Sequence, residues 1–151
     1  MMFEVDKGLY RGPRPTNFDD LKAKKISLTI CLQSGIFEFF KNDEYEDDAL
    51  RELYAIKRLN YKMSDFVGPT AKQLRGIVAV IEARLGYGST ILVHCAKGVD
   101  RTGLVCGAYR ILVQGWTYDA AVYEMDRLGF HKIPYQLWKR ALRELAEEKS
   151  K

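Results

Sequence analysis

Long apolar runs, paired cysteine motifs and histidine clusters are all missing from this sequence of 151 residues. No apolar run approaches the roughly 18 residues that a membrane-spanning helix needs, so we expect no membrane span. The three cysteines form no Cys-x-x-Cys pair, and two histidines cannot complete a usual zinc site with them. We therefore expect reduced thiols in the cytoplasm, no disulfide framework, no bound metal and no cofactor.

Blocks of charge of one sign are missing as well. The net charge is +4, but the basic residues are scattered among acidic ones. A mild positive excess favours anionic ligands, whereas a nucleic-acid partner is not expected without a basic block. The start of the chain has no apolar segment typical of a secretory leader. Since no repeat or Pro/Ser-rich linker divides the sequence either, we expect one domain over residues 1–151, and a monomer.

Strand-like and helix-like patterns alternate along the chain. Short apolar or alternating runs predict a short strand pair or one bent edge strand around Gly8 within 3–12, and strands at 26–32, 58–63 and 90–94. Helices are predicted for 15–25 with Thr16 as N-cap, 70–86 ending at Gly86, Arg101 to just before Gly115, 117–128 and 135–147. Residues 42–56 fit either a helix with Leu50, Leu53 and Tyr54 inward or an acidic loop. The alternation predicts an α/β fold whose central, mostly parallel sheet has four to five strands and helices on both sides.

The segment VHCAKGVDRTG, residues 93–103, joins a predicted buried strand to a predicted helix. Ligands bind beyond the carboxyl ends of parallel strands, at helix N-termini. Gly98 allows the loop to turn its amide groups inward around a tetrahedral anion, and Arg101 has the planar fork that holds two phosphate oxygens. The same groups stabilise the thiolate form of Cys95, which makes it a candidate nucleophile. The alternative is an unreactive buried thiol at the end of a strand.

The neighbours of Cys95 have assignable parts in such a site. Thr102 can donate its hydroxyl to the sulfur and stabilise the thiolate when it leaves, and His94 is expected to hydrogen-bond within the loop and set its shape. The predicted phosphate-binding residues are those of the loop itself: Ala96, Lys97, Gly98, Val99, Asp100 and Arg101.

Cleavage of a phosphate ester also needs an acid that protonates the leaving oxygen. Asp65 lies 30 residues before Cys95, between a predicted strand and the helix that begins after Pro69-Thr70. Its loop is therefore expected at the same edge of the sheet. The simpler alternative is that Asp65 is a turn or N-cap aspartate.

These motifs resemble the cysteine-dependent protein tyrosine phosphatase superfamily, in its small dual-specificity-like branch. HCAKGVDRTG is similar to the His-Cys-x5-Arg-Ser/Thr signature of that family, and MSDFVGPT looks like its general-acid loop. The opening LYRGPRPT and LKAKKISLTICL resemble bacterial and atypical members, so the resemblance spans nearly the whole chain. It implies a tyrosine-phosphatase-like fold and metal-free, two-step phosphomonoester hydrolysis through a phosphocysteine on Cys95, with Arg101 binding phosphate and Asp65 as general acid and base.

The resemblance also bounds the substrate. The expected substrate is a phosphoprotein, with phosphotyrosine first and phosphoserine or phosphothreonine after it. Phosphoinositide phosphatases often carry lysines where this sequence has Ala96 and Val99, and Asp100 adds negative charge beside Arg101. An inositol (poly)phosphate, as for phytases, and an RNA 5′-phosphate remain alternatives. A phosphopeptide-binding module is the non-enzymatic alternative.

Three further residues, Cys31, Arg11 and Arg14, have two interpretations each, and Cys106 has one. Cys31 ends a strand beside the central one, so it could form a disulfide with Cys95 on oxidation, although a small core residue is the simpler reading. Cys106 is expected in the core. Arg11 and Arg14 either contact a second phosphate or simply lie at the edge of the sheet, and we favour the edge.

Overall fold

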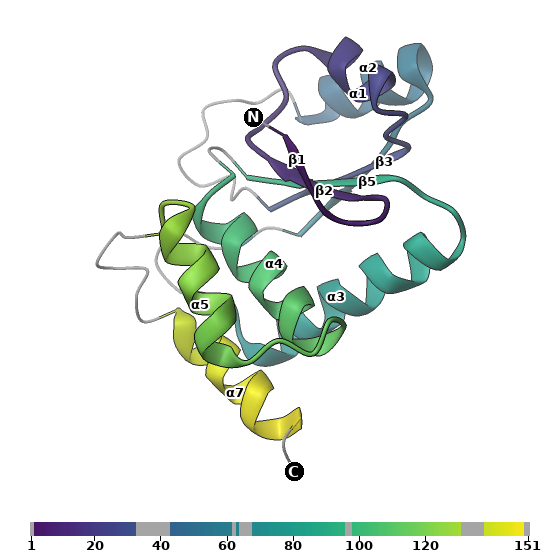
Figure 1. Cartoon of the computed structure of the whole chain (residues 1–151). Coiled ribbons are helices and arrows are strands. Elements are labelled where there is room, and N and C mark those ends of the chain that lie inside the picture. Colours follow the sequence, from purple (N-terminus) through teal and green to yellow (C-terminus); the bar gives the residue numbers. More distant parts are fainter. Residues whose placement is uncertain are drawn as a thin grey trace.

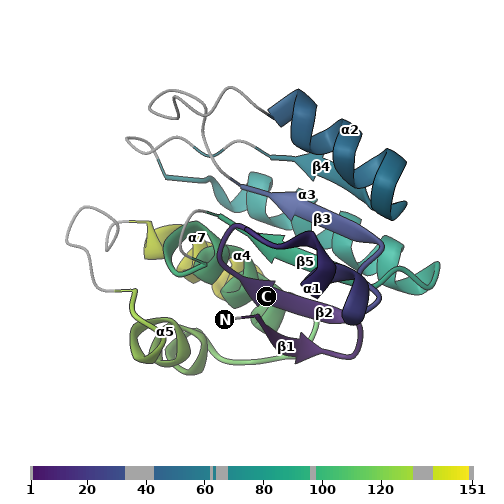
Figure 2. The same cartoon turned by 90° about the horizontal axis from the view of Figure 1, so that it is seen from above.

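A single five-stranded sheet organises the molecule, for which a computed structural model describes residues 2–32, 43–61, 63, 68–95, 98–130 and 138–149, with the backbone alone for 43–48 (Figure 1). The described strands run in the order β1-β2-β5-β3-β4. Only β1 is antiparallel to its neighbour within this sheet, so the predicted mostly parallel sheet is confirmed (Figure 2). The strands are β1 (Phe3–Asp6), β2 (Leu9–Gly12), β3 (Leu28–Cys31), β4 (Lys57–Asn60) and β5 (Ile91–His94).

Helices cover both faces of the sheet, as the sequence predicts. Two of them, α1 and α2, lie on one face, and α3, α4, α5 and α7 lie on the other (Figure 1). None of the helices in the described ranges is both long and apolar enough to cross a membrane. The helices are α1 (Phe18–Ala23), α2 (Asp43–Tyr54), α3 (Ala71–Gly86), α4 (Asp100–Leu112), α5 (Tyr118–Arg127) and α7 (Lys139–Lys149).

The central strand β5 is apolar on both sides because each side faces a separate core. Ile91 and Val93 belong to the larger core, which contains the helices α3, α4, α5 and α7. Leu92, between them, belongs to the smaller core with Leu21 of α1 and Leu50 of α2. Alternate residues of a strand point to opposite faces, so the uninterrupted apolar run ILV is the expected pattern for a strand buried on both sides.

The helix α3 has the start and end that its sequence predicts. The hydroxyl of Thr70 accepts a hydrogen bond from the backbone N–H of Gln73 at 3.1 Å, and the Gln73 side chain accepts one from the N–H of Thr70 at 2.9 Å. This reciprocal capping box satisfies two N–H groups that a helix start otherwise leaves unpaired. The helix ends at Gly86, and its buried residues are Ala71, Leu74, Ile77, Val78 and Ile81.

Two local expectations are corrected. The N-cap of α1 is Asn17 and not Thr16, because the Asn17 side chain accepts the hydrogen bond from the N–H of Asp19 at 2.9 Å. The segment 42–56 contains the helix α2, but Leu53 is 75% exposed and does not face the core. Leu50 alone of the three expected residues is fully buried there, while Tyr54 is half-buried and packs edge-on against Phe18.

A partly buried arginine connects α4 to its neighbours. Arg110 donates to both carboxylate oxygens of Glu124 in α5 at 3.0 Å and to the carbonyl of Val5 in β1 at 2.8 Å. Its guanidinium also lies 4.4 Å from the centre of the Trp116 ring. At the end of α4, Lys149 of α7 donates to the carbonyl of Ile111 at 2.7 Å. These contacts fix the helix whose first turn follows the predicted phosphate loop.

Candidate active site

The predicted nucleophile lies at the carboxyl edge of the sheet. Strand β5 ends at His94, Cys95 follows it, and α4 begins at Asp100. In the parallel pairing, Gly12 of β2 and Cys31 of β3 are level with His94, so three strand ends meet around this loop. Cys95 is 5% exposed and packs in the larger core. This is the position where a parallel sheet binds ligands.

Thr102 forms a hydrogen bond with the sulfur of Cys95. Its Oγ1 donates a hydrogen bond to Cys95 Sγ at 3.1 Å, and both residues are buried. The contact joins the third residue of α4 to the residue that directly follows β5, seven positions earlier in the sequence. A hydroxyl in this position can donate a charged hydrogen bond to the sulfur whenever the sulfur bears negative charge.

Gly98 is required by the shape of the loop. Its φ is +74°, a conformation that side-chain-bearing residues rarely adopt. A Cβ atom on Gly98 would also lie 2.4 Å from the carbonyl carbon of Gly12 and 2.6 Å from the nitrogen of Pro13. The loop therefore crosses directly over the end of β2, and only glycine fits both the conformation and the space.

Arg101 extends across the strand ends. It is half-buried in the first turn of α4, and its Nη1 donates to the carbonyl of Leu32 at 3.4 Å. Leu32 directly follows β3, so the guanidinium lies over the same edge as Cys95. The residue just before α4, Val99, is its N-cap and has no side-chain hydrogen bond to the helix. The Val99 side chain thus leaves the amides of the first turn uncapped. An anion site at a helix N-terminus requires such uncapped amides.

The remaining predicted residues divide into described and undescribed ones. His94 is 3% exposed, and its Nδ1 lies 3.4 Å from the carbonyl oxygen of Cys95, which agrees with a part in loop shape. Asp100 is half-buried as the first residue of α4. Ala96, Lys97 and Asp65 lie outside the described residues, so their predicted places remain predictions.

Arg11 is the residue whose place the sequence reasoning got wrong. We expected it at the edge of the sheet, but it is 2% exposed, and its Nη2 donates to the carbonyl of Gly98 at 3.0 Å. The signal was available: Arg11 is two residues after the buried Leu9, and strand alternation places the two on one face. Charged residues are usually exposed, and this tendency predicts the edge of the sheet for Arg11, whereas the alternation predicts the interior.

The cysteines show why a Cys31–Cys95 disulfide is not favoured. All three cysteines are buried and have reduced thiols. Cys31 is level with His94, and neighbours in register project to the same face, whereas Cys95 comes one residue later and packs into the core with α3 and α4. Cys106 lies in that core as predicted, and burial raises the pKa of its thiol.

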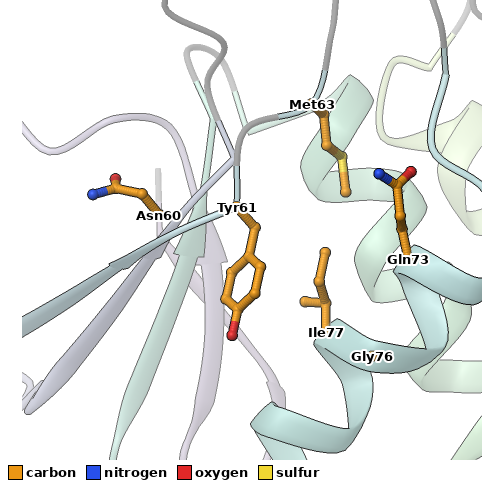
Figure 3. A pocket seen from close by; sticks show the side chains of 6 residues that line it. All are labelled: Asn60, Tyr61, Met63, Gln73, Gly76 and Ile77. Atoms are coloured by element: carbon orange, nitrogen blue, oxygen red, sulfur yellow. The ribbon is translucent and has the colours of Figure 1, made fainter.

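A pocket of about 480 Å³ lies beside the predicted site, between the end of β4 and α3 (Figure 3). Its lining contains no predicted site residue. The backbone N–H of Met63 donates to the Leu32 carbonyl at 3.3 Å, the same oxygen that accepts from Arg101, so the pocket adjoins the site through Leu32. The lining residues are Asn60, Tyr61, Met63, Gln73, Gly76 and Ile77.

The sequence of residues 17–147 matches the family model of the dual specificity phosphatase catalytic domain. The chain belongs to this family. Among relatives, it is 55% identical over 40 residues to the dual specificity protein phosphatase TpbA of Pseudomonas aeruginosa, 26% of this chain and 18% of that protein. It is 27% identical over 132 residues to the inositol diphosphatase DSP3 of Arabidopsis thaliana, 82% of this chain and 59% of that protein. These matches thus span less than two thirds of either relative.

Solved structures that match the chain share its fold. The active form of Tk-PTP is similar with a TM-score of 0.76 and 24% identity, covering 97% of this chain and 96% of that one. P. aeruginosa TpbA has a TM-score of 0.76 and 22% identity, covering 99% and 91%. The predicted tyrosine-phosphatase-like fold is therefore confirmed.

Proposed function

We propose that the chain hydrolyses phosphomonoesters as a dual-specificity-type phosphatase, with Cys95 as nucleophile. One observation carries the proposal: the Thr102 hydroxyl donates to the Cys95 sulfur at 3.1 Å, at the edge of a parallel sheet in a chain of this family. A thiol with a buried hydroxyl donor, beside a loop that only glycine can close, has the parts that a phosphoryl-accepting thiolate needs.

The proposed reaction has two steps. In the first, the Cys95 thiolate attacks phosphorus, an S–P bond forms, and the ester P–O bond breaks while Asp65 gives its proton to the leaving oxygen. In the second, Asp65 takes a proton from water, the water oxygen attacks phosphorus, and the S–P bond breaks. Inorganic phosphate leaves and the thiolate returns, stabilised by Thr102.

The loop and Arg101 hold the phosphoryl group in both steps. In the proposal, the amides of residues 96–101 donate to its oxygens, and the Arg101 guanidinium binds two of them. The guanidinium exchanges its long hydrogen bond to the Leu32 carbonyl, 3.4 Å, for a charged partner. No step calls for a metal ion.

A phosphoprotein is the first substrate class that we propose, with phosphotyrosine ahead of phosphoserine and phosphothreonine. In support, a structure of P. aeruginosa TpbA in complex with pTyr shares the fold with a TM-score of 0.76 and 20% identity, covering 99% of this chain and 90% of that one. Inositol (poly)phosphate is the second class, because DSP3, which is named an inositol diphosphatase, matches 82% of the chain.

Wider expectations from the sequence complete the proposal. We infer one phosphatase domain over residues 1–151, acting as a monomer in the cytoplasm.

Turnover of p-nitrophenyl phosphate in the presence of EDTA tests the proposal. Wild type is expected to be active, and Cys95→Ser and Arg101→Lys are expected to lose nearly all activity while keeping their folds. An inactive wild type that still binds inorganic phosphate would favour the phosphopeptide-binding alternative. Release of phosphate from phosphotyrosine and phosphoserine peptides, inositol phosphates and RNA 5′ ends then ranks the substrate classes.

A further inference from the structure

Arg11 is a buried cation whose charge is not neutralised by the part of the protein that the structure describes. Its side chain is 2% exposed, and only Nη2 has a hydrogen-bond acceptor, the carbonyl of Gly98. Nε and Nη1 are buried and have no partner among the described residues. A guanidinium stays ionised at every physiological pH, and burying it without a counter-charge is costly. The stability of the fold therefore does not explain why an arginine is buried at this position.

The surroundings of Arg11 place it directly behind the predicted phosphate loop. It lies on β2, opposite Val93 of β5 and Phe3 of β1, and its guanidinium carbon is 5.5 Å from the centre of the Phe3 ring. A Cβ atom on Gly103, in the first turns of α4, would be 3.7 Å from Nη2. Arg11 thus fills the space between β2, the loop and the start of α4.

The hydrogen bond to Gly98 determines which way one loop peptide faces. In a trans peptide, the carbonyl of Gly98 and the N–H of Val99 point in opposite directions. Because the carbonyl points back to Arg11, the Val99 N–H points away from Arg11, toward the front of the loop. An anion cradle needs its N–H groups on that side and its carbonyl groups on the other. Without the Arg11 donor, this buried carbonyl would have to seek another partner.

The charge of Arg11 acts over a wider range than its hydrogen bond. Burial raises the pKa of Cys106, and the positive charge of Arg11 opposes that rise. Cys106 lies one turn after Thr102 on α4, so the charge of Arg11 acts on the same part of α4 that holds the Thr102 donor. In a buried environment, a fixed cation behind the loop stabilises negative charge in front of it.

We propose that Arg11 is a positioning residue for phosphate binding: it holds the 98–99 peptide in the anion-accepting orientation and supplies a fixed positive charge behind the loop. Arg101 binds phosphate oxygens from the front, whereas Arg11 does not contact the substrate. The inference rests on the proposed function. It explains why a buried arginine lacks a carboxylate partner: the bound phosphate and the Cys95 thiolate are the counter-charges.

The test compares Arg11→Met with wild type in three measurements. These are the dissociation constant for inorganic phosphate by calorimetry, kcat and KM with p-nitrophenyl phosphate, and Tm without phosphate. We expect phosphate affinity and kcat/KM each to fall about ten- to hundredfold, the effect of losing a charged hydrogen bond. The Tm without phosphate is expected to stay within a few degrees of wild type, because the variant also removes an unpaired buried charge.

Arg110→Met is the matched control, since Arg110 is a largely buried arginine, with 13% of its side chain exposed, and its hydrogen-bond partners are away from the loop. It should lower Tm clearly and leave phosphate affinity within about twofold of wild type. The inference is wrong if Arg11→Met binds phosphate and turns over p-nitrophenyl phosphate as wild type does, whether or not its Tm is lower. If Arg11→Met does not fold, the neutral variant Arg11→Gln is measured instead, and its phosphate dissociation constant and kcat/KM decide.

The outcomes separate the inference from the proposed function. If wild type hydrolyses p-nitrophenyl phosphate and Arg11→Met does so equally well, only the inference fails. If wild type binds inorganic phosphate without turnover and Arg11→Met weakens that binding, the hydrolase proposal fails and the role of Arg11 in the anion cradle stands. If wild type neither binds phosphate nor hydrolyses the ester, both fail.

Discussion

The Oγ1 of Thr102 lies 3.1 Å from the sulfur of Cys95, and both atoms belong to buried residues at the start of α4 and the end of β5. In the proposed reaction, this hydroxyl matters most when the sulfur leaves phosphorus as a thiolate. Thr102→Val keeps the shape of the side chain and removes the donor. We expect kcat with p-nitrophenyl phosphate to fall about tenfold, with a burst of p-nitrophenol as the phosphocysteine accumulates.

Thr29→Val is the control for this substitution. Thr29 is 1% exposed on β3, and its hydroxyl has no partner among the described residues. Its replacement should leave kcat and Tm close to wild type. If Thr102→Val has the kcat of wild type and shows no burst, Thr102 does not stabilise the leaving thiolate in the second step.

Gly98 gives a second prediction, because two separate features forbid a side chain there. Gly98→Ala combines a φ of +74° with a Cβ atom only 2.4 Å from the carbonyl carbon of Gly12. The loop or the end of β2 must therefore shift, and a displacement of about 1 Å at a reacting centre can cost about a hundredfold in rate. We expect kcat/KM for p-nitrophenyl phosphate to fall at least that much, and inorganic phosphate binding to weaken in parallel.

Gly88→Ala separates crowding from backbone strain. Gly88 also has a positive φ, +88°, but a Cβ atom there would meet nothing within 4 Å. This variant should lose about 1 kcal/mol of stability, as expected for strain alone, and keep its activity. Equal activity losses in the two variants would mean that crowding at Gly12 is not what matters.

Much of the site could be read from the sequence because the chemistry is local to one segment. The apolar run before Cys95 predicts a buried strand, Gly98 predicts the turn, and the apolar spacing after Arg101 predicts the helix, as found in β5 and α4. Arg11 lies 84 residues before Cys95 in the sequence, and no local pattern links the two. Its contact with Gly98 exists only because β2 and β5 pair in the sheet.

Elsewhere, the sequence was ambiguous for physical reasons. Leu53 fits an amphipathic helix, but among the side chains described in α2 it is Leu50 that is buried, and Leu53 is 75% exposed. Thr16 and Asn17 are both good N-cap residues, so their order alone could not decide between them. The structure resolves the choice through the Asn17 hydrogen bond to Asp19.

The pairing of β3 with β5 makes a prediction about oxidation. Since Cys31 shares the face of His94 while Cys95 packs on the other side, peroxide should oxidise Cys95 without linking it to Cys31. Mass spectrometry of the peroxide-treated, non-reduced protein measures this directly. Cys31→Ser is expected to recover activity after reduction as wild type does. A Cys31–Cys95 peptide pair, or faster irreversible loss in Cys31→Ser, would contradict it.

The contact between Tyr109 and Asp6 predicts how stability depends on pH. The Tyr109 hydroxyl donates to Asp6 Oδ2 at 2.7 Å, and this bond, with the N–H of Lys7, holds the pKa of Asp6 below its ordinary value of 3.8. A lowered pKa in the folded state adds stability that is present above pH 3.8 and is lost as the pH falls through the folded value. Tyr109→Phe should remove part of it, so the stability difference from wild type should shrink on acidification.

The alkaline side gives the opposite sign for the same pair. Burial, followed by the hydrogen bond to Asp6, raises the pKa of Tyr109 well above its ordinary value of 10. The folded state therefore keeps this proton when the unfolded chain loses it, and wild type should lose stability above pH 10 more steeply than Tyr109→Phe. Urea unfolding across pH measures both limbs, with Tyr87→Phe as control because Tyr87 is 88% exposed. Parallel curves for wild type and Tyr109→Phe would show that the Tyr109–Asp6 bond contributes nothing to stability.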